Sequence, residues 1–406
     1  MSNIHDIPGH TTRPRALIDL AAMARNYAKL DAVTGRARIG ASVKADAYGL
    51  GLSQVSKALY GAGCRTFFVA TPGEGKFLRD AVGDNSTIYV LNGPAPQDLG
   101  LYFKAKLRPV LNSTYQVGLW AEHAGIAKHA PYSALMVDTG MNRLGVSMEE
   151  AKKLAGSAQL QKRIGLDHVM SHLACAPTPK HPKNAEQLAM FGDVAKLFPK
   201  ATKSLANSAG IFLGEAYHFD MVRPGIALYG GQHTLPRGAG MEPVVVLQGN
   251  VLQVRNVLAG ETLGYDATFT APEAMQVATV AAGYADGLPV QLSGTNDRPG
   301  GTALIGDGVA RIVGRVSMDL TLLDVTGMDV TIGQTASFFG AKIGEAAKRA
   351  GTNEYALLTG LGQRVRREIV RTEPHSPDAL PPSASAKRPP KGRGRTSRPQ
   401  KSPRRR

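Results

Sequence analysis

Residues 39–230 repeat one pattern of apolar and polar positions. Eight short apolar or β-branched runs each end in a polar or glycine-containing turn, and a helical segment usually follows. The runs occupy residues 41–46, 67–71, 88–93, 108–113, 134–140, 169–175, 204–210 and 222–230. Their mean spacing of about 26 residues is the length of one strand, one helix and two short loops. The pattern predicts a (β/α)8 barrel, with an open doubly wound sheet as the alternative.

The segment after the first run shows the helical half of this repeat. Leu52, Val55 and Leu59 fall at i, i+3 and i+7, which places them on one face of a helix. Gly61 and Gly63 follow and are typical of a helix end.

From about residue 240 the pattern changes to β-rich segments separated by turns. Asp307-Gly308 lies between two apolar runs and predicts a hairpin. Helical patterns return only at residues 342–351 and 353–361. We therefore expect a barrel over 15–239 and a mostly β domain over 240–372. The N-terminal segment, 1–14, precedes the barrel, and residues near 12–20 are candidates for an outer strand of the β domain.

Composition narrows the class of protein. The chain has 406 residues, of which 43% are hydrophobic and 20% charged, as in soluble globular proteins. It has no apolar run long enough to span a membrane and no apolar stretch at its N-terminus, so a cytoplasmic location is expected. Two cysteines, Cys64 and Cys175, exclude a disulfide scaffold, and no histidine spacing suggests a metal site, so no metal is expected.

The net charge of +16 is concentrated at the C-terminus. Residues 371–406 contain 11 Lys and Arg against 2 Asp and Glu, and 8 of the 25 prolines. Such a segment buries too little apolar surface to fold, so 373–406 is interpreted as a disordered basic tail. It could contact nucleic acid or acidic lipid through phosphates, but a solvated extension without a specific partner is favoured.

The ends of the predicted barrel strands carry the candidate chemistry, because the βα loops of a barrel form one mouth. One lysine, Lys44, lies in a run otherwise suited to a buried strand. Burial would lower its pKa and make it a candidate for Schiff-base chemistry, although a lone lysine is more often simply exposed. Other polar residues at these ends are Arg143, His172, Asn207-Ser208 and Arg223-Pro224-Gly225-Ile226.

Three of these elements suit one cofactor. Ser208 and the backbone N–H groups of Gly225 and Ile226 could hold a phosphate at the barrel mouth. Lys44 could form an imine, and Arg223 could contact a ring. Together they indicate pyridoxal 5'-phosphate (PLP).

The sequence also resembles the alanine racemase family. The similar segments are SVKADAYGLG, VDTGMNRLG, SHLACA, ANSAG, VRPGIALYG, LGYDATFTA, AGYADGLP and VGRVSMDLTLLDV, in family order over about residues 15–370. The resemblance implies a fold type III PLP enzyme, a barrel followed by a β domain, that interconverts L-alanine and D-alanine. It also implies a homodimer in which each active site is shared between a barrel and the partner's β domain. In the cell the product would serve peptidoglycan synthesis, or D-alanine would be catabolised.

The resemblance assigns cofactor contacts residue by residue. Lys44 matches the lysine that holds PLP and acts as one catalytic base, and Tyr48 matches a tyrosine near the phosphate. His172 matches a histidine beside the pyridine ring, and Arg223 the arginine at the pyridine nitrogen. Further matches, to phosphate contacts, are Ser208, Gly225 and Ile226.

The remaining assignments concern the substrate. Arg143 matches an arginine on the cofactor's phenolic oxygen and the substrate carboxylate. Tyr265 matches the second catalytic base, supplied by the partner subunit. Residues that match those closing the substrate pocket are Tyr284, Met318 and Asp319.

The implied chemistry explains these residue types. Racemisation removes the α-proton from one face and returns a proton to the other, which two bases on opposite faces accomplish. An arginine at the ring nitrogen stays charged and disfavours a protonated ring, which limits transamination and decarboxylation. Many other PLP enzymes place a carboxylate there, so Arg223 is the feature that most narrows the reaction type.

The chain departs from the family pattern at two places. Many relatives carry a carbamylated lysine that orients the arginine matched by Arg143, whereas Met136 stands there in this chain. Arg143 would then be positioned by an anion or another side chain. Many relatives also have a tyrosine near the C-terminus that reaches the phosphate, and Gln363 is aligned with it here.

Three other functions compete with this interpretation. A racemase or epimerase for serine, lysine or another amino acid would share the motifs. A non-catalytic PLP carrier would lack the β domain and Tyr265, and a PLP decarboxylase would carry a carboxylate in place of Arg223. Nucleic-acid binding would rest on the tail alone.

Overall fold

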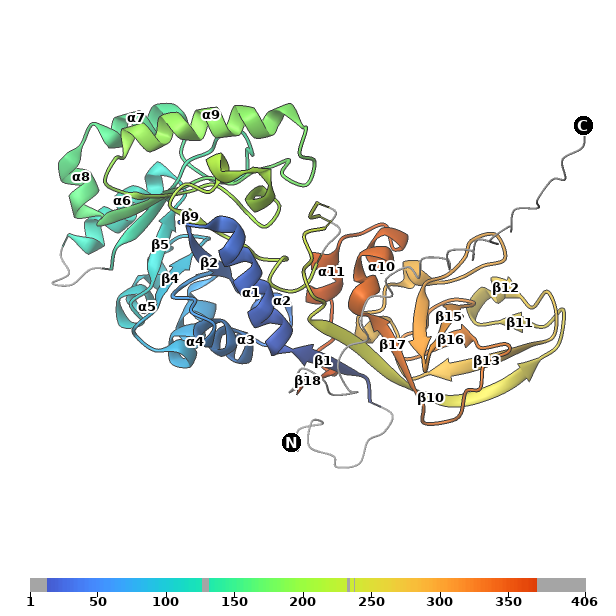
Figure 1. Ribbon diagram of the computed structural model, residues 1–406. Coiled ribbons are helices and arrows are strands. Elements are labelled where there is room, and N and C mark those ends of the chain that lie inside the picture. Colours follow the sequence, from blue (N-terminus) through green and yellow to red (C-terminus); the bar gives the residue numbers. More distant parts are fainter. Residues whose placement is uncertain (1–12, 126–130, 232–233, 237, 371–406) are drawn as a thin grey trace, which may run out of the picture.

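The structure, a computed structural model, describes residues 13–125, 131–231, 234–236 and 238–370. It has two parts joined side by side, an N-terminal barrel and a C-terminal domain built on a sheet (Figure 1). The predicted basic tail, 373–406, and residues 1–12 lie outside the described residues.

Eight parallel strands form the barrel, in the order β8-β7-β6-β5-β4-β3-β2-β9. Backbone hydrogen bonds from Asp220 to Lys203 (3.1 Å) and from Arg223 to Ala206 (2.9 Å) join β9 to β8 and close it. The predicted barrel is therefore confirmed, and the open sheet is excluded. The strands are β2 Arg38–Ser42, β3 Thr66–Val69, β4 Thr87–Val90, β5 Arg108–Leu111, β6 Ser133–Met136, β7 Leu166–Met170, β8 Thr202–Ser204 and β9 Met221–Val222.

Every strand overlaps the apolar run that predicted it and ends before that run does. β2 ends at Ser42, so the placement of Lys44 inside a strand is wrong, and Lys44 instead begins the turn that follows. The apolar character continues past each strand because the following loops line a pocket rather than solvent. The site residues assigned within the barrel thus lie in the loops at the carboxyl ends of its strands.

Helices cover the outside of the barrel. Leu52, Val55 and Leu59 are buried on α3, as their spacing predicted. Thr71 and Ser147 begin two of the helices with reciprocal capping boxes. The helices are α1 Leu20–Thr34, α3 Leu52–Gly61, α4 Pro72–Val82, α5 Leu99–Lys104, α6 Thr114–Ala124, α7 Met148–Ala155, α8 Ala158–Arg163 and α9 Pro182–Leu197.

The second domain is built on an eight-stranded sheet in the order β13-β16-β15-β14-β17-β10-β1-β18, with β13 also paired to β10. The predicted hairpin is confirmed, since Ile305 and Gly308 pair across its turn. The strands are β1 Arg15–Asp19, β10 Val245–Val257, β13 Met275–Val280, β14 Thr302–Ile305, β15 Gly308–Ile312, β16 Thr321–Asp324, β17 Thr335–Phe339 and β18 Arg366–Val370. The pair β11 Thr262–Leu263 and β12 Phe269–Thr270 forms a separate ribbon.

The two domains share the start of the chain. β1 pairs antiparallel with β10 and parallel with β18, so residues 15–19 belong to the second sheet. The chain then enters the barrel directly through α1, whose N-terminus is capped by the Asp19 side chain. Two short helices, α10 Ile343–Arg349 and α11 Glu354–Thr359, lie on the side of the sheet that faces the barrel (Figure 1).

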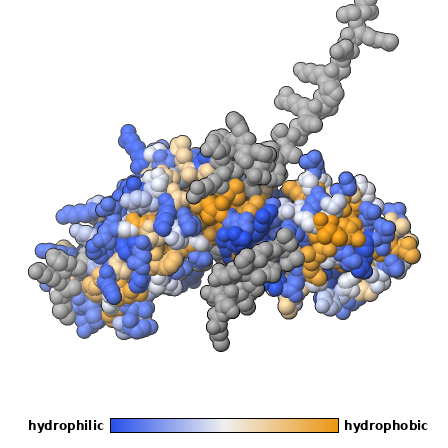
Figure 2. Space-filling view, turned by 90° about the horizontal axis from the view of Figure 1, so that it is seen from below, coloured by the Kyte–Doolittle hydropathy of each residue, from blue (hydrophilic) through white to orange (hydrophobic). Residues whose placement is uncertain are grey.

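The surface seen from below shows the same two lobes, with apolar residues gathered in several exposed patches (Figure 2). Within the described ranges, no helix is long and apolar enough to cross a membrane. The same part of the chain contains no cluster of His, Cys, Asp and Glu side chains suited to a metal ion.

Candidate active site

A cavity of about 440 Å³ opens at the carboxyl ends of the barrel strands. This volume lies within the usual range for small-molecule sites. Of the twelve residues that sequence analysis assigned to the site, eight line it: Lys44, Tyr48, Arg143, His172, Ser208, Arg223, Gly225 and Ile226. The loops after the strands thus bring side chains from distant positions to one opening.

Lys44 begins an unusual turn, α2 (Lys44–Tyr48). The residues from Ala45 to Tyr48 all have φ between 52° and 57°, the left-handed region. Left-handed helix costs roughly 1–2 kcal/mol per non-glycine residue, so the surroundings must hold this turn in place. Hydrogen bonds from Ala47 to Val43 (2.9 Å) and from Gly49 to Ala45 (2.8 Å) close it internally.

Glu74 on α4 connects this turn to the next strand end. One oxygen of its carboxylate accepts the N–H of Ala45 (2.6 Å), and the other accepts the N–H groups of Ala70 (2.8 Å) and Thr71 (3.1 Å). The carboxylate therefore satisfies three backbone donors from two loops. It fixes the residue next to Lys44 relative to the end of β3.

The amine of Lys44 is poised to act as a base. Partial burial lowers the pKa of Lys44, the positive charge of Arg143 lowers it further, and the charge of Glu74 opposes both effects. A larger share of the amine is then uncharged near neutral pH, and only the uncharged amine attacks a carbonyl or accepts a proton.

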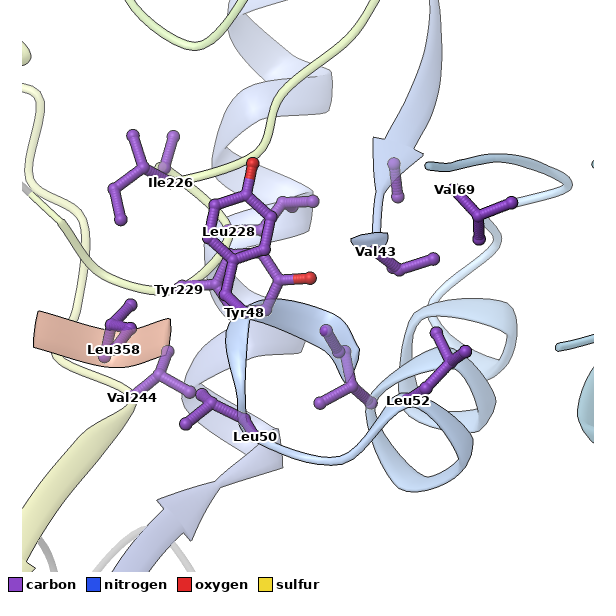
Figure 3. Packing of buried hydrophobic residues seen from close by; sticks show 14 of the residues in the cluster. Val43, Tyr48, Leu50, Leu52, Val69, Ile226, Leu228, Tyr229, Val244 and Leu358 are labelled. Carbon is purple, nitrogen blue, oxygen red and sulfur yellow. The ribbon is translucent and has the colours of Figure 1, made fainter. Parts of the chain in front are cut away.

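Tyr48 forms one wall of the cavity. Its ring stacks on that of Tyr229 at a centroid distance of 4.3 Å, within a cluster that includes Ile226 and Leu358 (Figure 3). Burial raises the pKa of Tyr48 to about 12, so its hydroxyl keeps its proton as a donor at the cavity.

Ser208 and the turn around Gly225 form a small polar cradle. The hydroxyl of Ser208 accepts the N–H groups of Gly225 (2.9 Å) and Ala227 (3.2 Å). The backbone at Gly225 passes so close to Tyr48 that a Cβ atom would lie 2.1 Å from the tyrosine oxygen. The turn thus requires glycine. Because the Ser208 oxygen accepts both N–H groups, its own O–H points onward as a donor of the kind that binds phosphate.

Arg223 occupies the base of the cavity. Its guanidinium donates to the hydroxyl of Ser204 and to the carbonyl of Ser171, and it approaches Nδ1 of His172 at 3.5 Å. Burial lowers the pKa of Arg223 to about 9, which leaves the group charged at neutral pH. Burial, followed by the charges of Arg223, Arg143 and Lys44, lowers the pKa of His172 to about 3, so its ring is neutral.

Arg143 reaches the cavity from a loop that its own sequence holds in place. The Asp138 carboxylate accepts the N–H groups of Gly140 (2.8 Å), Met141 (2.9 Å) and Asn142. The side chain of Met136 is buried at the end of β6 and also lines the cavity. An apolar group therefore ends β6 at the cavity.

Four of the assigned residues lie elsewhere, in the second domain. Tyr265, Tyr284 and Met318 are 67%, 45% and 52% exposed, and Asp319 is exposed as well. Two backbone hydrogen bonds, from Tyr284 to Ser317 and from Ala285 to Met318 (both 3.0 Å), hold the loops of Tyr284 and Met318 together. None of the four lines the cavity of its own chain.

Sequence analysis missed one wall of the cavity. Tyr355 on α11 lines it, with its ring centroid 5.9 Å from that of Tyr48. Gln363, which sequence analysis aligned with the C-terminal tyrosine of many relatives, is exposed and does not line the cavity, whereas Tyr355 does. No local signal marks Tyr355, since a tyrosine in an amphipathic helix usually packs in the core. Glu74 had a signal, the Thr71–Glu74 capping box, but its reach to Ala45 depends on the fold.

The residues in the cavity fit PLP. A lysine of lowered pKa suits its aldehyde, and the cradle of Ser208 and Gly225 suits its phosphate. The buried guanidinium of Arg223 suits its ring nitrogen as a donor. The convergence of Lys44, Ser208 and Arg223 on one cavity is the observation that most directly favours this ligand.

Two family models cover most of the chain. The alanine racemase N-terminal domain matches residues 18–233, and the alanine racemase C-terminal domain matches residues 244–369. The catabolic alanine racemase of Agrobacterium fabrum is 42% identical over 368 residues, which cover 89% of this chain and 92% of that protein. The alanine racemase of Methylobacterium nodulans is 44% identical over 369 residues, 88% of this chain and 96% of that protein.

Solved structures are similar over the same length. Alanine racemase from Bartonella henselae, with covalently bound pyridoxal phosphate, has a TM-score of 0.82 and 34% identity and covers 88% of this chain and 99% of its own. The biosynthetic alanine racemase from Pseudomonas aeruginosa has a TM-score of 0.80 and 31% identity, and the match covers 89% of this chain and 100% of that one.

Proposed function

The chain belongs to the alanine racemase family, and from that premise we propose that it interconverts L-alanine and D-alanine with PLP as its cofactor. One observation carries the proposal. Lys44, Arg143, Arg223 and the Ser208–Gly225 cradle line a single cavity at the barrel mouth. When bound, PLP supplies an electron sink that makes the α-proton of an amino acid removable.

The side chains of the barrel have distinct tasks in this proposal. Lys44 would hold the cofactor covalently, and once the amino group of the substrate has taken its place there, the released amine would move the proton at the α-carbon on one face of the substrate. Arg143 pairs with the substrate carboxylate, which fixes the direction of the Cα–H bond. Arg223 keeps a positive charge at the ring nitrogen and so restricts the reaction to proton transfer.

The second base is Tyr265 of the partner subunit in a homodimer. Tyr265, Tyr284 and Met318 expose large apolar side chains beside loops that do not reach their own cavity. Such exposed apolar groups favour a protein interface. In the dimer they would close the partner's cavity, and Tyr265 would act on the face opposite Lys44.

A second copy at this position also excludes water from the cavity mouth. The rotation that relates two copies makes both interfaces the same, so each dimer has two complete sites. Asp319 lies next to Met318 on this closing surface. Its carboxylate pairs with Arg364 (2.6 Å), which also binds the buried Asp286 and so holds Asp319 in place.

The cellular role follows from the products. In the cytoplasm the enzyme would supply D-alanine for peptidoglycan or start the catabolism of D-alanine. Relatives named for catabolism and for biosynthesis are both similar to this chain. Deleting the gene distinguishes a biosynthetic role from a catabolic role, because only loss of a biosynthetic enzyme makes growth depend on added D-alanine.

The direct test is incubation of the purified protein with PLP and L-alanine, followed by chiral chromatography. We expect a racemic mixture from either isomer. L-serine and L-lysine, tested in parallel, distinguish a racemase for another amino acid. Absence of the opposite isomer with all three substrates would exclude racemase activity on them.

A further inference from the structure

Helix α9 (Pro182–Leu197) presents two amides on its buried face. The buried residues are Asn184, Gln187, Phe191 and Val194. Both amides are almost fully buried, with exposed fractions of 1% for Asn184 and 0% for Gln187. Burying an amide is costly unless its donors and acceptor are satisfied. Among the described residues the acceptor of Gln187 is satisfied, whereas the Oδ1 of Asn184 has no hydrogen-bond partner.

Gln187 contacts two barrel loops at once. Its Oε1 accepts the N–H of Ala174 (2.9 Å), and its Nε2 donates to the carbonyl of His172 (2.9 Å). The same Nε2 donates to the hydroxyl of Thr139 (3.2 Å). His172 and Ala174 follow β7, whereas Thr139 follows β6. A single side chain therefore joins the ends of these two strands.

The contacts continue from Gln187 to Arg223 and to the loop that carries Arg143. Thr139 lies between Asp138 and Gly140, in the segment that Asp138 folds and that ends at Arg143. The hydroxyl of Thr139 is also 2.7 Å from that of Ser171, whose carbonyl accepts a hydrogen bond from Arg223. Gln187 thus lies where the Arg143 loop meets the segment that carries His172 and supports Arg223.

We propose that Gln187 is a positioning residue that sets the spacing between Arg143 and the His172–Arg223 side of the cavity; this rests on the proposed racemase function. Its amide joins the Arg143 loop to the His172 segment, so the substrate carboxylate and the cofactor ring are held at a fixed separation. Met136 offers Arg143 no charge or polar partner, and the loop-to-loop bond through Gln187 supplies the constraint instead.

Glutamine is needed because the site requires one acceptor and one donor on the same group. A carboxylate at this position would accept the N–H of Ala174, but its second oxygen would face the carbonyl of His172 without a proton to share. A protonated carboxyl group restores that donor. Gln187→Glu should therefore recover function as the pH falls.

Asn184 is a matched control on the same helix, less than one turn away. Its Nδ2 donates to the carbonyls of Cys175 (3.3 Å), Thr178 (3.0 Å) and Pro179 (3.4 Å). These partners lie in the later part of the loop between β7 and α9, beyond His172, and none of the three lines the cavity. Asn184→Ala removes a buried amide with a similar number of bonds, but it leaves the cavity unchanged.

The experiment compares Gln187→Ala, Gln187→Glu and Asn184→Ala as holoenzymes with the wild type. We expect Gln187→Ala to lower kcat/KM for alanine by about tenfold to a hundredfold, as small misplacements of binding groups do, and to weaken PLP binding. Asn184→Ala should keep both values within about twofold at a comparable loss of thermal midpoint. For Gln187→Glu, the kcat/KM relative to wild type should rise as the pH falls.

Two results would overturn the proposal: equal effects of Gln187→Ala and Asn184→Ala, or a Gln187→Glu ratio independent of pH. If Gln187→Ala does not fold, Thr139→Val tests the same bond, and unchanged kcat/KM and PLP affinity in that variant would also refute it. PLP affinity, measured by fluorescence titration, is independent of turnover. A wild type inactive on alanine would therefore refute the proposed function. An active wild type whose kcat/KM and PLP affinity are unchanged by the Gln187 substitutions would refute only this inference.

Discussion

A Cβ atom added at Gly225 would lie 2.1 Å from the hydroxyl oxygen of Tyr48 and 3.0 Å from its Cζ. The two residues come from the loops after the first and last strands of the barrel. Their close approach brings the backbone of Gly225 up to Tyr48, whose ring stacks on that of Tyr229. The contact fixes the shape of the phosphate cradle.

Gly225→Ala should therefore weaken PLP binding. Either Tyr48 or the Gly225 turn must move, and overpacking of this kind costs about 1–3 kcal/mol. Equilibrium titration of the apoenzyme with PLP should show roughly a tenfold to hundredfold loss of affinity. Gly118→Ala on α6 is the control, because a Cβ there meets no atom within 4 Å. Affinity unchanged by Gly225→Ala would mean that the cradle does not hold the cofactor.

Glu74 should control the turn that carries Lys44. In Glu74→Gln, the amide group cannot accept hydrogen bonds on both sides, so either Ala45 or the Ala70–Thr71 pair loses its acceptor. We expect the left-handed turn to relax and the covalent attachment of PLP to slow. Stopped-flow absorbance measures that rate. Thr71→Ala removes only the helix cap of α4, worth about 1 kcal/mol, and should leave the attachment rate near that of the wild type.

The rate of attachment should also report the pKa of Lys44. The uncharged amine is the nucleophile, so the rate rises with pH and levels off above the pKa. Because burial and Arg143 lower this pKa, the midpoint should lie below that of free lysine. Arg143→Met removes a positive neighbour and should raise the midpoint, whereas Glu74→Gln removes a negative one and should lower it. Shifts in the same direction in both variants would contradict the electrostatic account.

Borohydride reduction identifies the attachment site. The reduced pyridoxyl group should be recovered by mass spectrometry on the peptide containing Lys44 and be absent in Lys44→Ala. Recovery on another lysine of the wild type would place the cofactor elsewhere.

The sequence predicted the barrel and the main site residues, but not where each strand ends. The repeat of apolar runs predicted a barrel because strand, helix and loop each impose their own length. It did not locate the strand ends, since residues such as Val43 remain apolar where the loop packs inside the molecule. Motif resemblance assigned Lys44 and Arg223 to one site although 178 residues separate them along the chain, because each lies in a segment similar to the family pattern.

Contacts between distant segments were not accessible in this way. Tyr355 reaches Tyr48 only because α11 packs beside the turn of α2, where Leu358 approaches Gly49. Gln187 has an ordinary position in an amphipathic helix, and its partners become visible only when β6 and β7 lie side by side. Such residues carry no local pattern because their role depends on the geometry of two other segments.

Arg364 should stabilise the loops of the proposed dimer surface. It donates to the buried carboxylate of Asp286 from Nε (2.7 Å) and Nη2 (2.9 Å) and also pairs with Asp319. Because Arg364 is partly exposed, Arg364→Ala should cost about 1–3 kcal/mol, less than for a fully buried pair. Chemical denaturation measures this loss. Adding Asp286→Asn should recover part of it, and no recovery would mean that the buried charge is not the cause.

In the proposed dimer, each active site is shared between two chains. Lys44 lies in the barrel, whereas Tyr265 is exposed on the second domain and does not reach the cavity of its own chain. Tyr265→Phe should suppress proton removal from L-alanine far more than PLP binding, and Lys44→Ala should abolish covalent attachment and slow both directions. Removing a general base typically costs on the order of 10²–10⁴-fold in rate.

Mixing these two inactive variants tests whether the bases come from different subunits. In a mixed dimer one site carries both substitutions and the other carries neither. Random exchange of equal amounts makes about half of the dimers mixed, each with one intact site of two, so roughly a quarter of wild-type activity should return by symmetry. Native mass spectrometry verifies the exchange. If mixed dimers form and no activity returns, the two bases act within one chain, or Tyr265 is not the second base.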